Sequence, residues 1–173
     1  RVVVLAPNHL VSTWVDAFLK WTNICQSNIN IVLKTEKISP KPLLIASYSA
    51  AVRLTESIQS QDYDLVIVDE SHEIKNVKTQ IYQKISPILS KSKYLVLLSG
   101  TPMTRPSELY PQIRLLLPQV FPSFKDFGAR YCHGEFNSFG HFETTGCTHS
   151  EELKTVLENL IMLRREKDAV LTD

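Results

Sequence analysis

Five short runs of apolar residues limit most strongly how this chain can fold. They occupy residues 1–6, 29–33, 43–47, 65–69 and 94–99, and β-branched residues and leucine dominate them. Runs that stay apolar at successive positions are typical of strands buried on both faces, as in a parallel sheet. The sequence therefore predicts a mostly parallel sheet that is covered on both sides.

Helical periodicity separates these runs. The first helix is predicted over 9–21 from an apolar stripe with spacings of four and three, formed by Leu10, Trp14, Phe18 and Trp21. This stripe favours both tryptophans as core residues. Further helices are predicted over 49–59, over 78–89 with a kink at Pro87, and near 150–164. Strands that alternate with helices indicate an α/β layered domain with right-handed crossovers, whose ligands bind at the carboxyl ends of the strands.

Local signals suggest where two of the helices begin. Asn8 is a candidate N-cap for the first helix, and Thr148 with Glu151 fits a capping box for the last one. Pro111 falls where a helix interior is expected, which costs roughly 3 kcal/mol unless the helix breaks there.

The chain changes character after Gly100, where proline and aromatic residues become frequent. We therefore predict two parts: an α/β part over 1–118 and a helical extension over 119–173. The start of the chain has neither a signal-peptide layout nor an initiator Met, which suggests a fragment.

Charge and cysteine usage constrain the function only loosely. A formal net charge of +1 gives no bulk argument for nucleic-acid binding. Three widely spaced cysteines fit a reducing compartment better than a disulfide framework, and no apolar run approaches the roughly 20 residues that cross a bilayer. An intracellular protein without a membrane partner is expected.

Two adjacent carboxylates, Asp69 and Glu70, follow the fourth apolar run directly, and Ser71 and His72 come next. A phosphoryl-transfer site needs one carboxylate to hold Mg²⁺ and a second group to orient or deprotonate the attacking water. Asp69 suits the first role, with the metal held through water, and Glu70 suits the second. A solvated acidic turn is the plain alternative for an isolated pair of this kind.

Several ordered motifs resemble the Swi/Snf branch of the superfamily-two ATPases. DESHEIKN over 69–76 resembles the DExH box, and LLSGTP over 97–102 resembles the Ser-Gly-Thr/Ser-Pro motif. Residues 5–21 and 46–53 resemble the DNA-tracking motifs of that family, and 160–171 resembles its basic closing segment. Ser71, RPSELYPQI and FGARYC point to the annealing-helicase, or HARP-like, branch.

The resemblance implies a partial RecA-like lobe of three layers, an α/β fold with a mostly parallel sheet and a C-terminal helical appendage. The strand and helix of the phosphate-binding loop would be missing, because the sequence contains no G-x-x-x-x-G-K-[ST]. The resemblance also implies ATP and Mg²⁺ as cofactors, and both need the phosphate-binding loop. The implied partners are duplex or forked DNA and a second RecA-like lobe, in the nucleus.

The resemblance also assigns roles to residues. His72 would transmit the nucleotide state to the second lobe, and Ser99, Gly100 and Thr101 would couple hydrolysis to DNA contact, although Gly100 and Pro102 alone fit a tight turn. The candidate DNA-binding residues are Pro7, Ser12, Thr13, Ser47 and Tyr48.

Zinc is not expected, because the Cys and His residues between 132 and 149 follow no regular zinc spacing. The leading hypothesis is a DNA-dependent ATPase whose isolated fragment is inactive. The alternatives are a noncatalytic lobe that serves as a binding or scaffold module, and an RNA motor.

Overall fold

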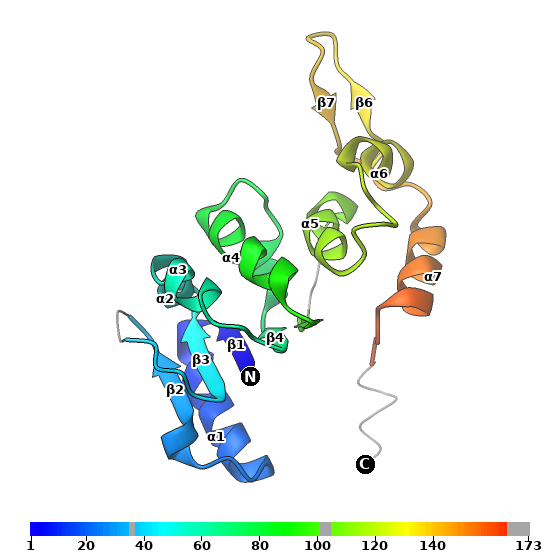
Figure 1. Ribbon diagram of the computed structural model, residues 1–173. Coiled ribbons are helices and arrows are strands. Elements are labelled where there is room, and N and C mark those ends of the chain that lie inside the picture. The colour runs from blue at the N-terminus through cyan, green and yellow to red at the C-terminus, as the bar shows by residue number, and fades with distance from the viewer. Residues whose placement is uncertain (35–36, 101–104, 166–173) are drawn as a thin grey trace.

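The computed structural model describes residues 1–34, 37–100 and 105–165. Its centre is a five-stranded sheet in the order β2-β3-β1-β4-β5, in which every neighbouring pair is parallel (Figure 1). The strands are β1 (Val2–Ala6), β2 (Ile29–Val32), β3 (Leu43–Ser47), β4 (Leu65–Val68) and β5 (Tyr94–Leu97). The prediction of a parallel α/β sheet is confirmed.

One face of the sheet is covered by α1 (Val11–Trp21), which follows a 3-10 turn, η1 (Asn8–Leu10). Val11 and Val15 of this helix are buried against Val4 and Ile45 of the central strands. A second 3-10 turn, η2 (Gln26–Asn28), leads from this helix towards β2. The helix α1 thus begins at the carboxyl end of β1, where a ligand of an α/β sheet is expected.

The opposite face of the sheet is covered by α2 (Tyr48–Arg53), α3 (Thr55–Gln59) and α4 (Gln80–Lys91). These helices bury the largest hydrophobic cluster, to which Leu5, Ile58 and Ile85 contribute side chains without exposed surface. The 3-10 turn η3 (Ser71–Ile74) connects β4 to this layer, and its Ile74 is buried in the same cluster.

A second body lies beside the sheet and contains α5 (Pro106–Leu116), α6 (Phe124–Tyr131) and α7 (Ser150–Leu160). A short antiparallel hairpin, β6 (Glu135–Phe136) with β7 (Phe142–Glu143), projects from it in Figure 1. This body has its own hydrophobic cluster, formed by residues of α5, α6 and α7 together with Phe121 and Cys132. Helix α5 joins the two bodies, because Ile113 lies in the second cluster while Leu115 packs against the first.

The predicted burial of 94–99 on both faces is wrong. Tyr94 is 58% exposed, Val96 40% and Leu98 38%, whereas Leu95 and Leu97 pack against the main cluster. The register places Tyr94 and Val96 on the side of the sheet that α1 covers. Helix α1 packs over β1 and β3, so the same side of the edge strand β5 stays open.

Trp21 also differs from the prediction, because it is 76% exposed rather than part of the core. It is the last residue of α1, beyond the turns that pack on the sheet. Trp14 is half-buried, as its place on the stripe indicates.

The predicted helix caps are not formed. Asn8 lies inside η1, where Pro7 is the residue before the turn, and neither supplies a side-chain cap. Thr148 donates its hydroxyl to the carbonyl of Arg130, while His149 precedes α7 in a left-handed conformation. Neither Asn8 nor Thr148 therefore occupies the N-cap position that the sequence pattern predicted for it.

Two of the predicted helices also differ in continuity. The helix predicted over 49–59 is interrupted at Leu54, between α2 and α3. Helix α5, in contrast, continues through Pro111, which is buried. The buried neighbours Tyr110, Gln112 and Ile113 hold this segment in the helix by packing, which offsets the lost backbone hydrogen bond.

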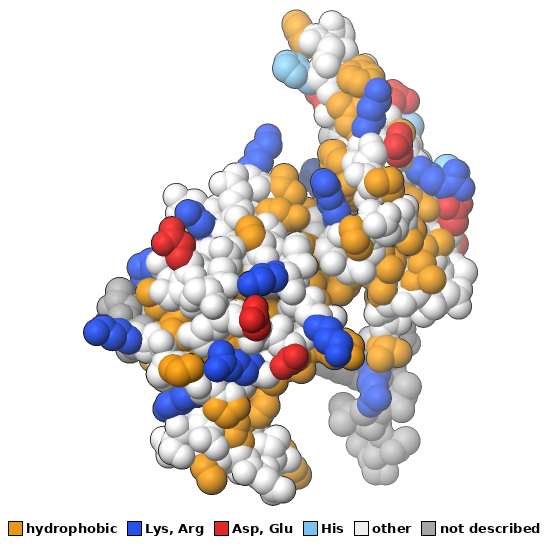
Figure 2. All heavy atoms as spheres, in the orientation of Figure 1, with side chains coloured by type: hydrophobic (Ala, Val, Ile, Leu, Met, Phe, Trp, Pro, Cys, Tyr) orange, Lys and Arg blue, Asp and Glu red, His pale blue; other side chains and the backbone are white. Residues whose placement is uncertain are grey.

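The surface does not show a single charged stripe on the face drawn in Figure 2, where Lys and Arg side chains are scattered among polar and apolar ones. Within the described parts of the chain, no helix is both long and apolar enough to cross a membrane.

Candidate functional site

The candidate site lies where β1, β4 and β5 end. Backbone hydrogen bonds continue beyond the strands: Asp69 N–H donates to the Leu5 carbonyl, Leu98 N–H to the Val68 carbonyl, and Ser71 N–H to the Leu98 carbonyl, each at 2.8 Å. The two motifs that follow β4 and β5 are therefore fixed next to each other at the carboxyl edge of the sheet.

Among the described residues, the Asp69 carboxylate has one donor on each oxygen. Its Oδ1 accepts from the Glu70 backbone N–H at 2.9 Å, and its Oδ2 accepts from the Trp14 indole Nε1–H at 2.8 Å. A carboxylate oxygen has two lone pairs, so each oxygen keeps one for water or a cation. Oxygen donors of this kind are the ligands that Mg²⁺ prefers, often through water, and the residue fits the predicted role.

Tyr48 holds the backbone of the same residue. Its hydroxyl donates to the Asp69 carbonyl at 2.6 Å, and the side chain is 6% exposed. Burial raises the pKa of this hydroxyl well above its ordinary value, and the negative charges of Glu73, Asp69 and Glu70 add to the effect. Tyr48 therefore remains a protonated donor throughout the range in which proteins work.

Glu70 begins a short chain of polar contacts. Its backbone is left-handed, with φ 49° and ψ 52°, and its Oε2 lies 3.1 Å from His72 Nδ1. The same nitrogen lies 3.5 Å from Ser99 Oγ, at the end of β5. Glu70 and His72 have side chains that are 37% and 36% exposed, so both reach solvent at this edge. The geometry thus joins the predicted water-activating carboxylate to the coupling motif.

A buried hydrogen bond and an ion pair connect this segment to the second body. Ser71 Oγ donates to Gln112 Oε1 at 2.7 Å, and both side chains are buried. Lys75 Nζ lies 3.3 Å from Glu108 Oε1, in a half-exposed ion pair. Both partners belong to α5, so this helix is attached directly to the acidic motif.

The remaining predicted site residues are spread along the same edge. Gly100 is exposed beside Ser99, and Thr101 lies outside the described residues. Pro7 is half-buried after β1, and Ser12 and Thr13 are exposed in the first turn of α1. These last three are placed where a partner could reach them.

Ser47 and Tyr48 do not fit the predicted DNA contact, because both side chains are buried. Ser47 is 1% exposed and caps α2 by accepting from the Ala50 N–H, while it donates to the Leu33 carbonyl. The Tyr48 hydroxyl is hydrogen-bonded to the backbone carbonyl of Asp69. The hydroxyls of Ser47 and Tyr48 form hydrogen bonds inside the lobe.

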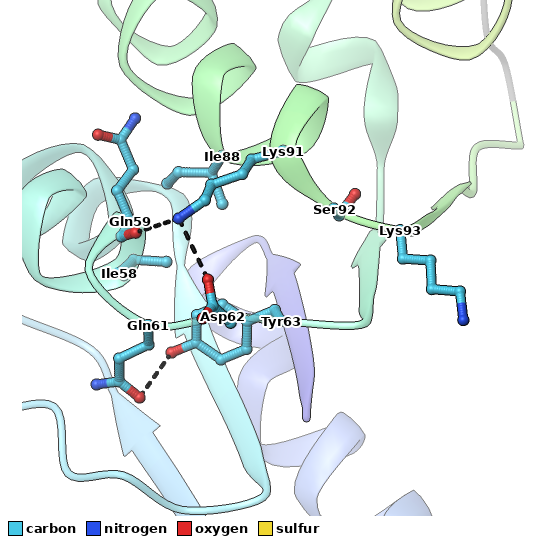
Figure 3. Close-up of a pocket in the computed structure, with 9 residues that line it drawn as sticks. All are labelled: Ile58, Gln59, Gln61, Asp62, Tyr63, Ile88, Lys91, Ser92 and Lys93. Atoms are coloured by element: carbon cyan, nitrogen blue, oxygen red, sulfur yellow. Dashed lines mark hydrogen bonds and ion pairs between the residues drawn. The ribbon is translucent and has the colours of Figure 1, made fainter.

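Two cavities of the structure lie away from this edge, one of them between Phe121, Arg130 and Val156 in the second body. The other cavity, of about 160 Å³, is at the opposite end of the sheet, where Tyr63 and Lys93 precede β4 and β5 (Figure 3). There Lys91 contacts the Asp62 carboxylate at 3.3 Å and the Gln59 carbonyl at 3.2 Å. Neither the lining of this cavity nor that of the other includes Asp69, Glu70 or His72.

Among residues 1–34, 37–100 and 105–165, no group of three or more His, Cys, Asp or Glu side chains is placed to hold a metal ion. Cys132 is buried, and burial raises the pKa of its thiol to about 11, with Cys147 adding to the shift. A thiol in this state is a poor nucleophile and metal ligand.

Sequence reasoning missed two residues of the site, Trp14 and Gln112. Trp14 was assigned to the core, yet its N–H contacts the acidic motif 55 positions away. A signal existed, because a partly buried tryptophan N–H needs an acceptor and the first helix starts at the ligand-binding edge. Gln112 gave a weaker signal, as a polar residue among the apolar positions of α5.

Comparison with known families identifies the class of this fold and site. The model of the SNF2-related domain family matches residues 1–173, so the chain belongs to the SNF2-related domain family. The resemblance predicted from the acidic motif and its companions is confirmed.

Named relatives narrow this assignment. The chain is 37% identical over 174 residues to the SWI/SNF-related matrix-associated actin-dependent regulator of chromatin subfamily A-like protein 1 of Xenopus tropicalis, covering 99% of this chain and 18% of that protein. It is 32% identical over 183 residues to the human DNA annealing helicase and endonuclease ZRANB3, covering 99% of this chain and 17% of the relative. The predicted branch is confirmed, and the chain spans less than a fifth of the length of these relatives.

Solved structures agree on the fold. The Sulfolobus solfataricus SWI2/SNF2 ATPase core in complex with dsDNA matches with a TM-score of 0.68 at 20% identity, over 94% of this chain and 33% of that one. A second structure, the Sulfolobus solfataricus SWI2/SNF2 ATPase core domain, matches with the same TM-score of 0.68 at 20% identity, over 98% of this chain and 34% of that one. The chain therefore has the RecA-like α/β fold of an SNF2 ATPase lobe.

Proposed function

We propose that this chain is part of the first motor lobe of an ATP-driven DNA translocase, an annealing helicase that remodels duplex or forked DNA in the nucleus. The observation that carries the proposal is the chain of contacts from Glu70 through His72 to Ser99, beside Asp69 at the carboxyl edge of β4 and β5. A scaffold has no chemical need for this arrangement. The names of the relatives, a DNA annealing helicase among them, support the same function.

In this proposal Asp69 would hold Mg²⁺ through water, and Mg²⁺ with ATP would supply the charge stabilisation of phosphoryl transfer. Glu70 orients the attacking water and accepts its proton. His72 senses Glu70 and passes the nucleotide state to a second RecA-like lobe. Ser99, Gly100 and Thr101 connect that change to the DNA-facing part of the lobe.

Pro7, Ser12 and Thr13 are the proposed DNA contacts of this lobe. Ser12 and Thr13 are exposed at the start of α1, where hydroxyl and backbone N–H groups can meet a phosphate. We keep the division into a lobe over 1–118 and an extension over 119–173 as a proposal, in which α5 belongs to the lobe and also supports the extension.

The test is ATP hydrolysis by the protein that contains this chain together with a phosphate-binding loop and a second lobe, with and without forked DNA. Hydrolysis is expected to rise strongly with DNA. Glu70→Gln is expected to preserve nucleotide binding and to lower turnover by roughly 10² to 10⁴ fold, the usual worth of a general base. An unchanged rate would remove Glu70 from the mechanism.

A noncatalytic scaffold is the second candidate, favoured by the lack of a G-x-x-x-x-G-K-[ST] in these 173 residues. For the same reason the isolated chain is expected to be inactive. Absence of hydrolysis from the longer protein with every DNA would support the scaffold, and stimulation by RNA instead of DNA would indicate an RNA motor.

A further inference from the structure

The indole of Trp14 and the carboxylate of Asp69 form a direct link between two elements that are far apart in the sequence. Trp14 Nε1–H donates to Asp69 Oδ2 at 2.8 Å across 55 positions, in a partly buried setting. Tryptophan has one polar hydrogen, and here it is used on the acidic motif. The second carboxylate oxygen accepts from the Glu70 N–H, so two donors fix the plane of the carboxylate.

The backbone of Asp69 is held independently of this contact. Its N–H donates to the Leu5 carbonyl at 2.8 Å, and its carbonyl accepts from the Tyr48 hydroxyl at 2.6 Å. Loss of the indole N–H would therefore free Oδ2 of Asp69 and leave its carboxylate held through Oδ1 alone, while its backbone stays in place. Trp14 controls the orientation of one carboxylate rather than the course of the chain.

Trp14 itself is held by the packing of α1. Val11 and Val15 of this helix are buried on the sheet, and the ring centroids of Trp14 and Phe18 are 5.9 Å apart. The indole is thus positioned by the body of the helix, and a shift of α1 moves the donor with it.

Ser12 and Thr13 precede Trp14 in the same helical turn and are exposed. A partner that contacts these hydroxyls acts on the helix whose next residue, Trp14, donates to Asp69. One helical turn and the Trp14 side chain therefore separate a partner at Ser12 or Thr13 from the Asp69 carboxylate.

We propose that Trp14 is a positioning residue, which holds the Asp69 carboxylate in its metal-binding orientation and couples that orientation to contacts made by the start of α1. This inference rests on the proposed function, because it assumes that Asp69 serves Mg²⁺ and nucleotide. Residues that hold a metal-binding group in this way typically affect metal affinity or activity by about 10- to 100-fold.

The experiment uses Trp14→Phe in the longer protein that contains the chain, with Trp21→Phe as the matched control. Both replace a tryptophan of α1 by the same residue, and Trp21 is 76% exposed at the far end of the helix. Binding of a fluorescent ADP is followed by anisotropy while Mg²⁺ is varied, and DNA-stimulated and basal hydrolysis are measured in parallel.

Trp14→Phe is expected to raise the Mg²⁺ concentration for half-maximal nucleotide binding by about 10-fold or more. It is also expected to reduce the ratio of DNA-stimulated to basal hydrolysis. Trp21→Phe is expected to stay within about twofold of the original protein in both, as exposed substitutions usually do. An unchanged Mg²⁺ dependence and an unchanged ratio in Trp14→Phe would overturn the inference.

The failure of the proposed function has a different signature, because the unsubstituted protein would then show neither Mg²⁺-dependent nucleotide binding nor hydrolysis. If Trp14→Phe does not fold, 5-fluorotryptophan in the unsubstituted protein gives a second test by NMR, with Trp21→Phe to aid assignment. The Trp14 signal is expected to shift with Mg²⁺ and ADP while the Trp21 signal does not. A Trp14 signal that stays fixed would overturn the proposal.

Discussion

The hydroxyl of Ser71 donates a 2.7 Å hydrogen bond to the amide oxygen of Gln112, and both side chains are buried between the acidic motif and α5. This bond and the Lys75–Glu108 ion pair tie the second body to the residues that follow β4. A residue with no hydroxyl at position 71 would lose the buried part of this connection.

Ser71→Ala is expected to lower the free energy of unfolding by about 1 kcal/mol, the net worth of one hydrogen bond. Gln112→Ala is expected to cost more, because it leaves the buried Ser71 hydroxyl without its acceptor and removes packed atoms. Urea unfolding of both single variants and the double variant measures the coupling. Strictly additive effects would show that the bond contributes nothing.

The contact between α6 and α7 predicts a response to acid. Glu152 accepts from Arg130 and from the Tyr131 hydroxyl, and these bonds hold its pKa at about 2, below the ordinary 4.5. A lowered folded-state pKa stabilises the protein fully above pH 4.5, and that contribution is lost as the pH falls towards 2.

Glu152→Gln is therefore expected to flatten the fall of thermal stability between pH 4.5 and 2, relative to the original protein. Glu158→Gln is the control, since Glu158 is exposed in the same helix and forms no ion pair within the described part of the chain. Equal pH profiles for the two variants would contradict the assignment.

Tyr110 carries a hydroxyl that is buried and has no hydrogen-bond partner in the described structure. Burial of an unpaired polar group costs about 1 to 3 kcal/mol, so Tyr110→Phe is expected to leave stability unchanged or raise it by about 1 kcal/mol. Tyr48→Phe is the matched comparison, because it removes a hydroxyl that donates to Asp69, and it is expected to lower stability. Chemical denaturation of both variants measures whether their changes in unfolding free energy have opposite signs.

Gly134 lies at the base of the β6–β7 hairpin, where a Cβ atom would stand 2.7 Å from the backbone carbon of Gly128. Backbone cannot move aside as a side-chain end can, so Gly134→Ala is expected to destabilise the second body by about 1 to 3 kcal/mol. Ser138→Ala, exposed at the hairpin end, is expected to leave the melting temperature unchanged. Similar melting temperatures for both variants would argue against close packing at Gly134.

The strands were predictable because their signal is local. Each apolar run of the sheet is also a strand in the structure, from Val2–Ala6 to Tyr94–Leu97. The predicted burial failed at Val96 because an apolar run reports the capacity for burial, whereas coverage depends on where α1 packs. The prediction that Trp21 is buried failed for a related reason. Periodicity identifies which face of a helix is apolar, but not the point where the helix extends beyond the sheet.

The candidate site was predictable in part. Asp69 and Glu70 were predicted from an acidic pair at a strand end, and His72 and Ser99 from the resemblance of their motifs; the structure places all four close together, because β4 and β5 are parallel neighbours that end at the same edge. The partners of these residues were not predictable, because Trp14 and Gln112 reach them from 55 and 41 positions away. The burial of Ser47 and Tyr48 depends on the same long-range packing.

The left-handed backbone of Glu70, with φ 49°, sets stability against the proposed role of its carboxylate at one position. A residue with a Cβ pays roughly 1 to 2 kcal/mol in this region, and glycine does not. A search for heat-resistant variants would therefore favour Glu70→Gly, which removes the carboxylate assigned to water activation. Under the proposed role of Glu70, selection for thermal stability and selection for turnover would oppose each other at this residue, and thermostable variants chosen without a turnover screen would include inactive proteins.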